Sequence, residues 1–328
     1  DGLMSIFFLL IGLELEREVY AGELSNIKNA SFPIIAALGG VIVPATIYLL
    51  FNYGTAFQQG AGIPMATDIA FAIGMLALLG SRVPANLKVF LTALSVIDDL
   101  CAIIVIAIFY SSGFSFGYLA VAAGIFAALL ILNRLKVHNL IPYIIGGIAM
   151  WYCMLHSGIH ATIAGVMLAF AIPFGNGGEK SPSYILQHLL HKPVAFIIVP
   201  LFALANTAIV FEPGWAAGLS STAGIGIIMG LIPGKPLGIL LFTFLAVSFG
   251  ISKLPQGLQW KHIAGAGLLA GIGFTMSMFV ALLAFDDAAH IAAAKIAIIA
   301  ASVLAAILGL VILRIILKDK LPEEVQQE

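Results

Sequence analysis

The chain has 328 residues, of which 61% are hydrophobic and only 9% are charged, and its mean hydropathy is +1.10. Soluble domains usually carry about 25% charged residues, so a soluble protein of this composition would lack the polar side chains needed to cover its surface. The composition therefore predicts an all-α protein that crosses a membrane several times. The net charge of −1 gives no indication of nucleic-acid binding.

Apolar runs of the length that a membrane-spanning helix needs recur along the whole chain. About 20 helical residues cross the hydrocarbon core of a bilayer. We expect about eleven membrane segments, at 1–13, 30–51, 61–79, 89–110, 114–132, 140–155, 158–173, 193–211, 223–249, 263–285 and 291–317. The first is typical of the end of a helix, which predicts that an upstream segment is missing from this sequence. The runs at 140–155 and 158–173 are short, and we expect either compact spans or helices that neighbours shield from lipid.

Basic residues between the runs predict the orientation. Thirteen of the fifteen lysines and arginines lie in alternate loops or at the C-terminus, and therefore on one side of the predicted membrane. Lys295 falls on the other side, and Lys235 lies inside a run. Because loops rich in Lys and Arg stay in the cytoplasm, we expect these loops and the C-terminus to be cytoplasmic.

Two triplets of runs suggest an internal symmetry within one membrane domain that spans 1–328. Runs within about 30–110 begin on the cytoplasmic side, and runs within about 223–317 begin on the opposite side; the helices of 114–211 lie between these repeats. The middle run of each triplet is interrupted, by Pro64 in the first and by Gly271 and Gly273 in the second. This pattern indicates an inverted-repeat transporter with two discontinuous crossing helices, whose unwound backbone lines an ion site.

Four charged residues lie deep inside complete runs: Asp68, Asp98, Asp99 and Lys235. Each costs roughly 2.5–3.5 kcal/mol at a helix centre on insertion scales. Residues at this depth usually mark ion pathways, although ion pairs that merely hold helices together are the alternative. One lysine cannot neutralise three aspartates, so at least one carboxylate needs a proton or a metal cation.

Neighbouring positions on a helix differ by about 100° in direction. Asp98 and Asp99 therefore cannot both point at Lys235, and we expect one to pair with it while the other faces a cavity. A carboxylate that binds either a proton or Na⁺/Li⁺, but not both, is sufficient for antiport when its access alternates between the two sides.

Four glycines recur at every fourth position, at 226, 230, 234 and 238. This spacing places them on one face of a helix, and it predicts that another helix packs closely against that face.

Several motifs carry a resemblance to a known family. They are ATDIAFAIGMLALLGSRVP, LTALSVIDDLCAIIVIAIFY, SGIHATIAGV, PLFALANT, GKPLGI and GIGFTMSMFVALLAF. In this order they resemble the NhaA-type bacterial sodium/proton antiporters from Asp1 to about residue 317. The resemblance implies a twelve-helix fold, of which this chain lacks the first helix and most of the second.

The resemblance also implies roles for the buried charges. Asp99 matches the central cation- and proton-binding carboxylate, and Asp98 matches the second carboxylate, with Lys235 as its partner. Asp68 and Thr67 match residues at the first helix crossing. From their positions beside prolines we also expect Asp68 to offset the positive ends of the broken helices and Lys235 the negative ends, so that Lys235, Asp68 and Thr67 serve charge compensation and proton coupling. The bound metal ion would be transient Na⁺ or Li⁺ on Asp99 and Asp98. Asp1 matches an acidic position of the second helix.

A pH-sensing role is implied for Glu14, His188 and His191, which match positions on the cytoplasmic face of the family; ordinary interfacial residues are the alternative for the two histidines. At Gln187 and Glu16 this chain departs from the residue pattern of the family. These two differences concern how pH regulates transport. His160 matches a family position at the periplasmic rim.

The implied function is electrogenic exchange of cytoplasmic Na⁺ or Li⁺ for external H⁺, which is active at alkaline pH and serves sodium and pH homeostasis. We expect a multi-pass protein of the bacterial inner membrane that contacts lipid, possesses no cofactor, is not an enzyme and has no nucleic-acid or other protein partner. Whether this chain forms a homodimer is left open, because the family dimerises through a segment that this sequence lacks.

Two alternatives compete with antiport. A sodium-coupled solute symporter of related fold predicts a larger polar pocket and an arginine to hold an anion, and the broken segments offer no arginine. An intramembrane aspartyl protease needs two aspartates that face each other from different helices, whereas Asp98 and Asp99 are neighbours in sequence.

Overall fold

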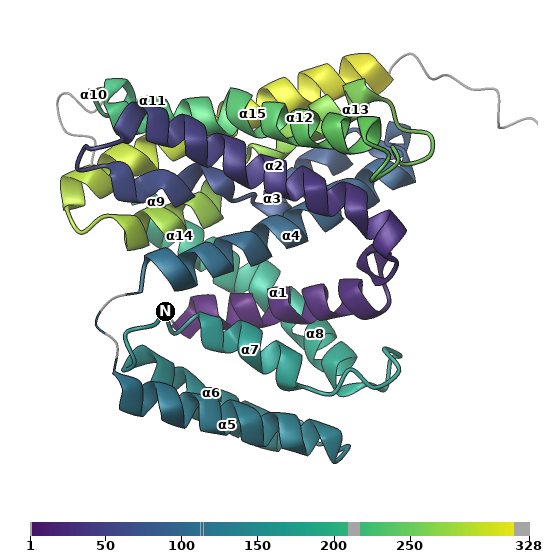
Figure 1. The fold of residues 1–328 in the computed structure, drawn as a ribbon, viewed down its shortest axis with the longest axis vertical. Helices are drawn as coiled ribbons and strands as arrows, with labels where there is room; N and C mark the ends of the chain where they lie inside the picture. The colour runs from purple at the N-terminus through teal and green to yellow at the C-terminus, as the bar shows by residue number, and fades with distance from the viewer. Residues whose placement is uncertain (1, 112, 114, 209–216, 318–328) are drawn as a thin grey trace, which may run out of the picture. The chain divides into compact units, whose positions relative to one another are not determined.

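The computed structural model describes residues 2–111, 113, 115–208 and 217–317, and these form helices and connecting turns without a β-strand among them (Figure 1). The described residues divide into two compact units. The first comprises the described residues of 2–26 and 99–208, and the second comprises those of 27–98 and 217–317. The predicted repeats fall mostly in the second unit, and the predicted intervening helices fall in the first.

The first unit is built on a pair of closely packed helices, α1 and α7. Its elements are α1 (Gly2–Tyr20), η1 (Glu23–Ser25), the end of α4 (Ala85–Phe109), α5 (Phe116–Arg134), α6 (Ile141–Leu155), α7 (Ile163–Ala171), α8 (Pro182–Pro193), η4 (Val194–Ile198) and α9 (Val199–Thr207). Small residues bring α1 and α7 together, since a Cβ on Gly165 would collide with the backbone of Ser5. Helices α5 and α6 lie side by side in the same unit (Figure 1).

The second unit contains both interrupted spans. Its elements are α2 (Ile27–Asn52), η2 (Gln58–Met65), α3 (Ile69–Ala77), η3 (Gly80–Arg82), the first part of α4, α10 (Ala217–Ser220), α11 (Thr222–Met229), η5 (Gly230–Gly234), α12 (Lys235–Ser248), α13 (Trp260–Ala270), α14 (Phe274–Ala284) and α15 (Ala288–Ile316). Helices α2 and α12 lie side by side (Figure 1).

The glycine face predicted at 226–238 packs as expected. A Cβ at each of the four glycines would meet α2 or η2, through Tyr48, Pro64, Pro44 or Gly39. The closest approach is between Gly39 and Gly238. A Cβ on either glycine would collide with the carbonyl oxygen of the other, so no larger residue fits at these two positions. The prediction of close helix packing is confirmed.

Seven helices of the described residues are long and apolar enough to cross a membrane: Ala30–Asn52, Gln58–Ala77, Ala85–Phe109, Phe116–Arg134, Pro182–Thr207, Thr222–Ser248 and Ala288–Ile316. The pair α13 and α14, bent by 50° at its break, adds an eighth. The chain is therefore a multi-pass membrane protein. The expected total of eleven stays a prediction, because α6 has 15 residues and α7 has 9.

One predicted boundary is wrong. The run expected at 193–211 belongs to a longer helical stretch that begins at Pro182, directly after the extended residue Ser181. Pro193 does not start this helix; it is the last residue of α8, and the π-helical turn η4 and helix α9 continue the stretch directly after it. His188 and His191 therefore lie on helix α8 rather than in a loop before a span.

Candidate ion-binding site

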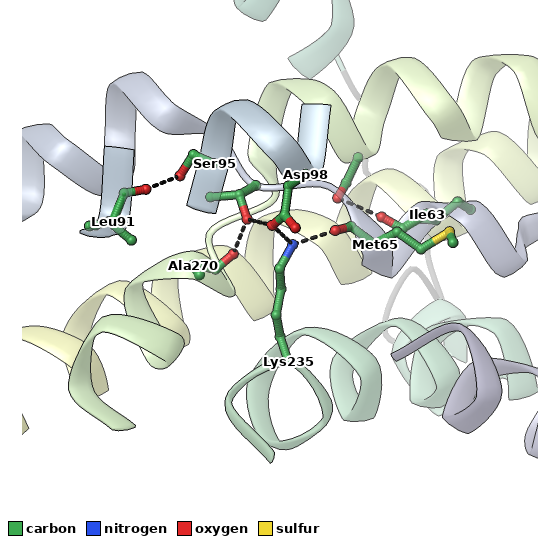
Figure 2. A network of polar contacts seen from close by, with 9 residues as sticks. Ile63, Met65, Leu91, Ser95, Asp98, Lys235 and Ala270 are labelled. Atoms are coloured by element: carbon green, nitrogen blue, oxygen red, sulfur yellow. Dashed lines mark hydrogen bonds and ion pairs between the residues drawn. The ribbon is translucent and has the colours of Figure 1, made fainter. Parts of the chain in front are cut away.

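A buried ion pair lies at the centre of the second unit. Lys235, the first residue of α12, extends its side chain to Asp98 on α4, with Nζ 2.9 Å from Oδ2 (Figure 2). Both side chains are fully buried. The ammonium also donates to the backbone carbonyl of Met65, at the end of η2. The predicted Asp98–Lys235 pair is therefore present, with a backbone acceptor that the sequence did not indicate.

Thr67 joins this pair to the second interrupted span. It belongs to the extended residues between η2 and α3, where the helix is broken just after Pro64. Its Oγ1 lies 2.7 Å from Asp98 Oδ2 and 2.9 Å from the carbonyl oxygen of Ala270, the last residue of α13. The hydroxyl therefore contacts a charged side chain and a helix end from different parts of the chain.

Asp68 compensates the N-termini of two helices at once. It is the N-cap of α3, and its Oδ1 accepts from Phe71 N at 3.3 Å. Its Oδ2 accepts from the backbone N–H of Thr275, at 3.1 Å, and from the Thr275 hydroxyl, both in the first turn of α14. Helix N-termini carry partial positive charge, so one carboxylate stabilises both. This geometry agrees with the charge compensation expected of Asp68.

The two breaks are also joined through backbone groups. Asp68 N–H donates to Ile272 O at 2.7 Å, and the Ser277 hydroxyl donates to Ile63 O at 2.7 Å. Gly271 and Gly273, the predicted glycines of the second break, lie too close to their surroundings for a side chain. A Cβ on Gly271 would collide with Leu231 O, and a Cβ on Gly273 would collide with the hydroxyl of Ser277.

Asp99 follows Asp98 on α4 and is also buried, with 1% of its surface exposed. Asp98 itself has a further oxygen, Oδ1, that is buried and accepts no hydrogen bond from the described residues. Among the described residues Lys235 is the one lysine or arginine that is buried, whereas Asp68, Asp98 and Asp99 are three buried aspartates. The charge imbalance predicted from the sequence therefore holds for the buried residues that the structure describes.

The predicted pH-sensing residues lie in the first unit, on α1 and α8. Glu14 Oε1 is 3.9 Å from His191 Nδ1, and the side chain of His191 is mostly exposed. His188 stacks on Tyr184, with ring centroids 6.1 Å apart. Glu14 follows the apolar run 1–13. Burial of its side chain, together with the nearby charge of Glu18, raises the pKa of Glu14 to about 7. The structure thus brings Glu14 and His191 together and places His188 beside a different residue.

Glu16 and Gln187, the two departures from the family pattern, also have defined positions. Gln187 accepts from Arg17 Nη1 at 3.5 Å, and the Arg17 guanidinium lies over the ring of Tyr184 at 4.9 Å. Glu16 is 3% exposed, and its Oε2 has no hydrogen-bond partner among the described residues. Burial raises the pKa of Glu16 to about 8.

His160 and Asp1 complete the predicted positions. His160 Nε2 lies 2.8 Å from Tyr110 O, within the first unit, so the ring holds the end of α4 to the turn before α7. Asp1 lies outside the described residues.

Three site contacts were not among the predicted site residues. Thr275 binds Asp68, Ser302 on α15 accepts from Phe274 N at 3.1 Å, and the Ala270 carbonyl accepts from Thr67. Thr275 had a signal, since it is a polar residue directly after the broken Gly271–Gly273 segment. No sequence signal could have identified Ser302 or the Ala270 carbonyl. Isolated serines are common in apolar runs, and every residue has a backbone carbonyl.

Known proteins are similar to this chain over nearly its whole length. A family model described as Na+/H+ antiporter 1 matches residues 1–313. The Na(+)/H(+) antiporter NhaA 1 of Flavobacterium johnsoniae is 66% identical over 317 residues, which cover 97% of this chain and 83% of the relative. The NhaA protein of Cytophaga hutchinsonii is 64% identical over 328 residues, covering 100% and 85%, and that of an Enterobacter species is 50% identical over 318 residues, covering 96% and 81%. The chain therefore belongs to the Na⁺/H⁺ antiporter 1 family.

Proposed function

We propose that this protein exchanges cytoplasmic Na⁺ or Li⁺ for external protons, with Asp98 and Asp99 as the carboxylates that bind either cargo. The observation that supports this most directly is the buried charge balance. Among the described residues, Lys235 is the one buried lysine or arginine, whereas Asp68, Asp98 and Asp99 are all buried, so one ammonium cannot neutralise the three carboxylates. The similar proteins of Flavobacterium johnsoniae and Cytophaga hutchinsonii are named as Na⁺/H⁺ antiporters, which supports exchange of these two ions.

The competition between the two cargoes follows from carboxylate chemistry. A carboxylate that holds a proton loses the negative charge that attracts Na⁺, and a bound Na⁺ excludes the proton electrostatically. When access to the site alternates between the two faces, each cargo displaces the other, and the result is antiport. Lys235 lies against Asp98, so a change in the charge of Asp98 also changes the environment of the ammonium.

The orientation and the regulation belong to the same proposal. The distribution of Lys and Arg supports a bacterial inner-membrane protein with a cytoplasmic C-terminus. Glu14, His188 and His191 would then lie at the cytoplasmic face, where they regulate transport by pH. Exchange is electrogenic, with more protons than sodium ions moved in each cycle. A homodimer, contact with lipid and the lack of a cofactor are further parts of the proposal.

Transport in everted vesicles tests this function. We expect a preformed acid-inside gradient, followed with a pH-sensitive dye, to dissipate on addition of NaCl or LiCl but little on addition of KCl. Asp99→Asn should abolish the response, and Asp98→Asn should weaken it or change its voltage dependence. Asp287→Asn is the matched control, because Asp287 caps the exposed start of α15 and should transport normally. Normal transport by Asp99→Asn would refute the assignment.

A further inference from the structure

Ser302 is the middle residue of α15, a spanning helix of 29 residues. It carries the one polar side chain in 296–313, a stretch that otherwise contains only apolar residues and glycine. The residue is buried, with 4% of its surface exposed. A hydroxyl half-way along a spanning helix is costly unless it has a hydrogen-bond partner within the protein.

The partner of Ser302 is a backbone group at the second helix break. Phe274, the first residue of α14, donates its N–H to Ser302 Oγ at 3.1 Å. The first N–H groups of a helix have no acceptor within the helix, and the N-cap of α14 is Gly273, which has no side chain to supply one. A Cβ on Gly273 would collide with the Ser277 hydroxyl, so this position cannot carry a capping side chain. Ser302 therefore caps α14 from another helix.

A second acceptor reaches the same turn of α14 from the first helix break. Asp68 Oδ2 accepts from the N–H of Thr275, the residue after Phe274, at 3.1 Å. Thr67 precedes Asp68 in the chain, and its Oγ1 lies 2.7 Å from Asp98 Oδ2. The first turn of α14 therefore connects the cap on α15 with the residues that surround Asp98.

We infer that Ser302 is a positioning residue for cation exchange, which holds the first turn of α14 against α15. The position of that turn fixes Asp68 and, through Thr67, the side chain of Asp98. Without the Ser302 oxygen, the first N–H of α14 is a buried donor that has lost its acceptor, and the turn loses its fixed position. Lys235 still holds Asp98, so the loss should weaken cation binding without abolishing it. The inference rests on the proposed function only in that Asp98 binds the transported cation.

Transport in everted vesicles tests this role through the NaCl concentration that gives half of the maximal response. In Ser302→Ala this concentration should rise about three- to tenfold, the size of one net hydrogen bond, while the maximal response is kept. Ser302→Thr keeps a hydroxyl and should restore the unaltered value. Thr243→Val is the matched control and should not change it, because the Thr243 hydroxyl is also buried in a spanning helix but donates to Ile239 O within α12.

Hydrogen–deuterium exchange of the purified full chain tests the cap itself, without transport. Exchange in the peptide that covers 273–280 should become about three- to tenfold faster in Ser302→Ala and stay unchanged in Thr243→Val. Ser302→Cys, with a weaker acceptor of similar size, should show smaller changes in both measurements and replaces the alanine variant if that variant does not fold.

Two results would overturn the inference. One is unchanged deuterium exchange in Ser302→Ala, which would show that Ser302 does not hold the first turn of α14. The other is faster exchange with an unchanged half-maximal NaCl concentration, which would show a local cap without influence on the cation. Absence of any Na⁺ response in the unaltered protein would instead refute the proposed function, and the deuterium exchange would still decide whether Ser302 holds α14.

Discussion

The paired helix breaks in the second unit and the polar cluster in the first unit hold charged groups in opposite ways. Beside the breaks, Lys235 and Asp98 are fully buried and 2.9 Å apart; Lys235 also contacts the carbonyl of Met65, and Asp98 also contacts Thr67. In the cluster on α1 and α8, Glu14 and the mostly exposed His191 are 3.9 Å apart. Water screens Glu14 and His191 but not Lys235 and Asp98. Removing one partner should therefore lower the free energy of unfolding much more for the buried pair than for the exposed one.

The largest effect is expected for Lys235→Ala. Removal of one partner from a buried pair typically costs about 3–5 kcal/mol, because the other charge is left buried. Thermal unfolding in detergent should therefore occur at a clearly lower temperature than in the unaltered protein. The double variant Lys235→Ala with Asp98→Ala should recover part of this loss, since no charge remains uncompensated. An unchanged unfolding temperature in the single variant would contradict the pair.

Asp68→Ala should follow in size. It removes a carboxylate that accepts hydrogen bonds from the first turns of both α3 and α14, and each charge-assisted bond contributes about 1.5–3 kcal/mol. Hydrogen exchange at Phe71 and Thr275 should increase along with a loss of thermal stability. Asp287→Ala, which removes the cap of α15 alone, is the control and should cost about 1 kcal/mol. Equal losses for the two variants would show that Asp68 does not cap both helices.

Glu16→Gln should give a smaller effect that depends on pH. The pKa of Glu16 is raised from 4.5 to about 8, so the folded state keeps a proton that the unfolded state loses. The free energy of unfolding therefore falls as pH rises between about 5 and 8, and the glutamine variant avoids this loss. Its unfolding temperature should match that of the unaltered protein at pH 5 and exceed it at pH 9. Glu179→Gln, at an exposed position, is the control; a constant difference at all pH values would contradict the buried acid.

The smallest change in stability is expected for His191→Ala. A partly exposed pair at 3.9 Å contributes about 0–1 kcal/mol, so the unfolding temperature should hardly move. If the cluster regulates transport, the pH profile of Na⁺ exchange should shift nevertheless. His156→Ala, at the C-cap of α6 beside the ring of Tyr152, is a control for removing a histidine elsewhere in the first unit. A profile identical to that of the unaltered protein would remove His191 from the proposed regulation.

Much of the fold and part of the site follow from the sequence. Charge in apolar runs located Asp68, Asp98, Asp99 and Lys235, and Pro64 and the 271–273 glycines located the two breaks. These predictions succeed because a charge or a broken helix inside lipid is costly wherever the rest of the chain lies. The start of the helix at Pro182 was missed because residues 182–192 contain Gln187, His188, His191 and Lys192 and therefore fall outside the apolar run that marks a span.

The sequence by itself determined that this chain crosses a membrane, that it carries more buried acids than buried cations, and that two of its spans are interrupted. Only the tertiary structure decided which backbone groups these side chains contact: the Met65 carbonyl for Lys235, and the N-termini of α3 and α14 for Asp68. It also decided that Thr67 contacts Ala270 across 203 positions of sequence. Local energies fix where a charge or a break occurs, whereas a hydrogen bond between distant segments depends on distances that only packing sets.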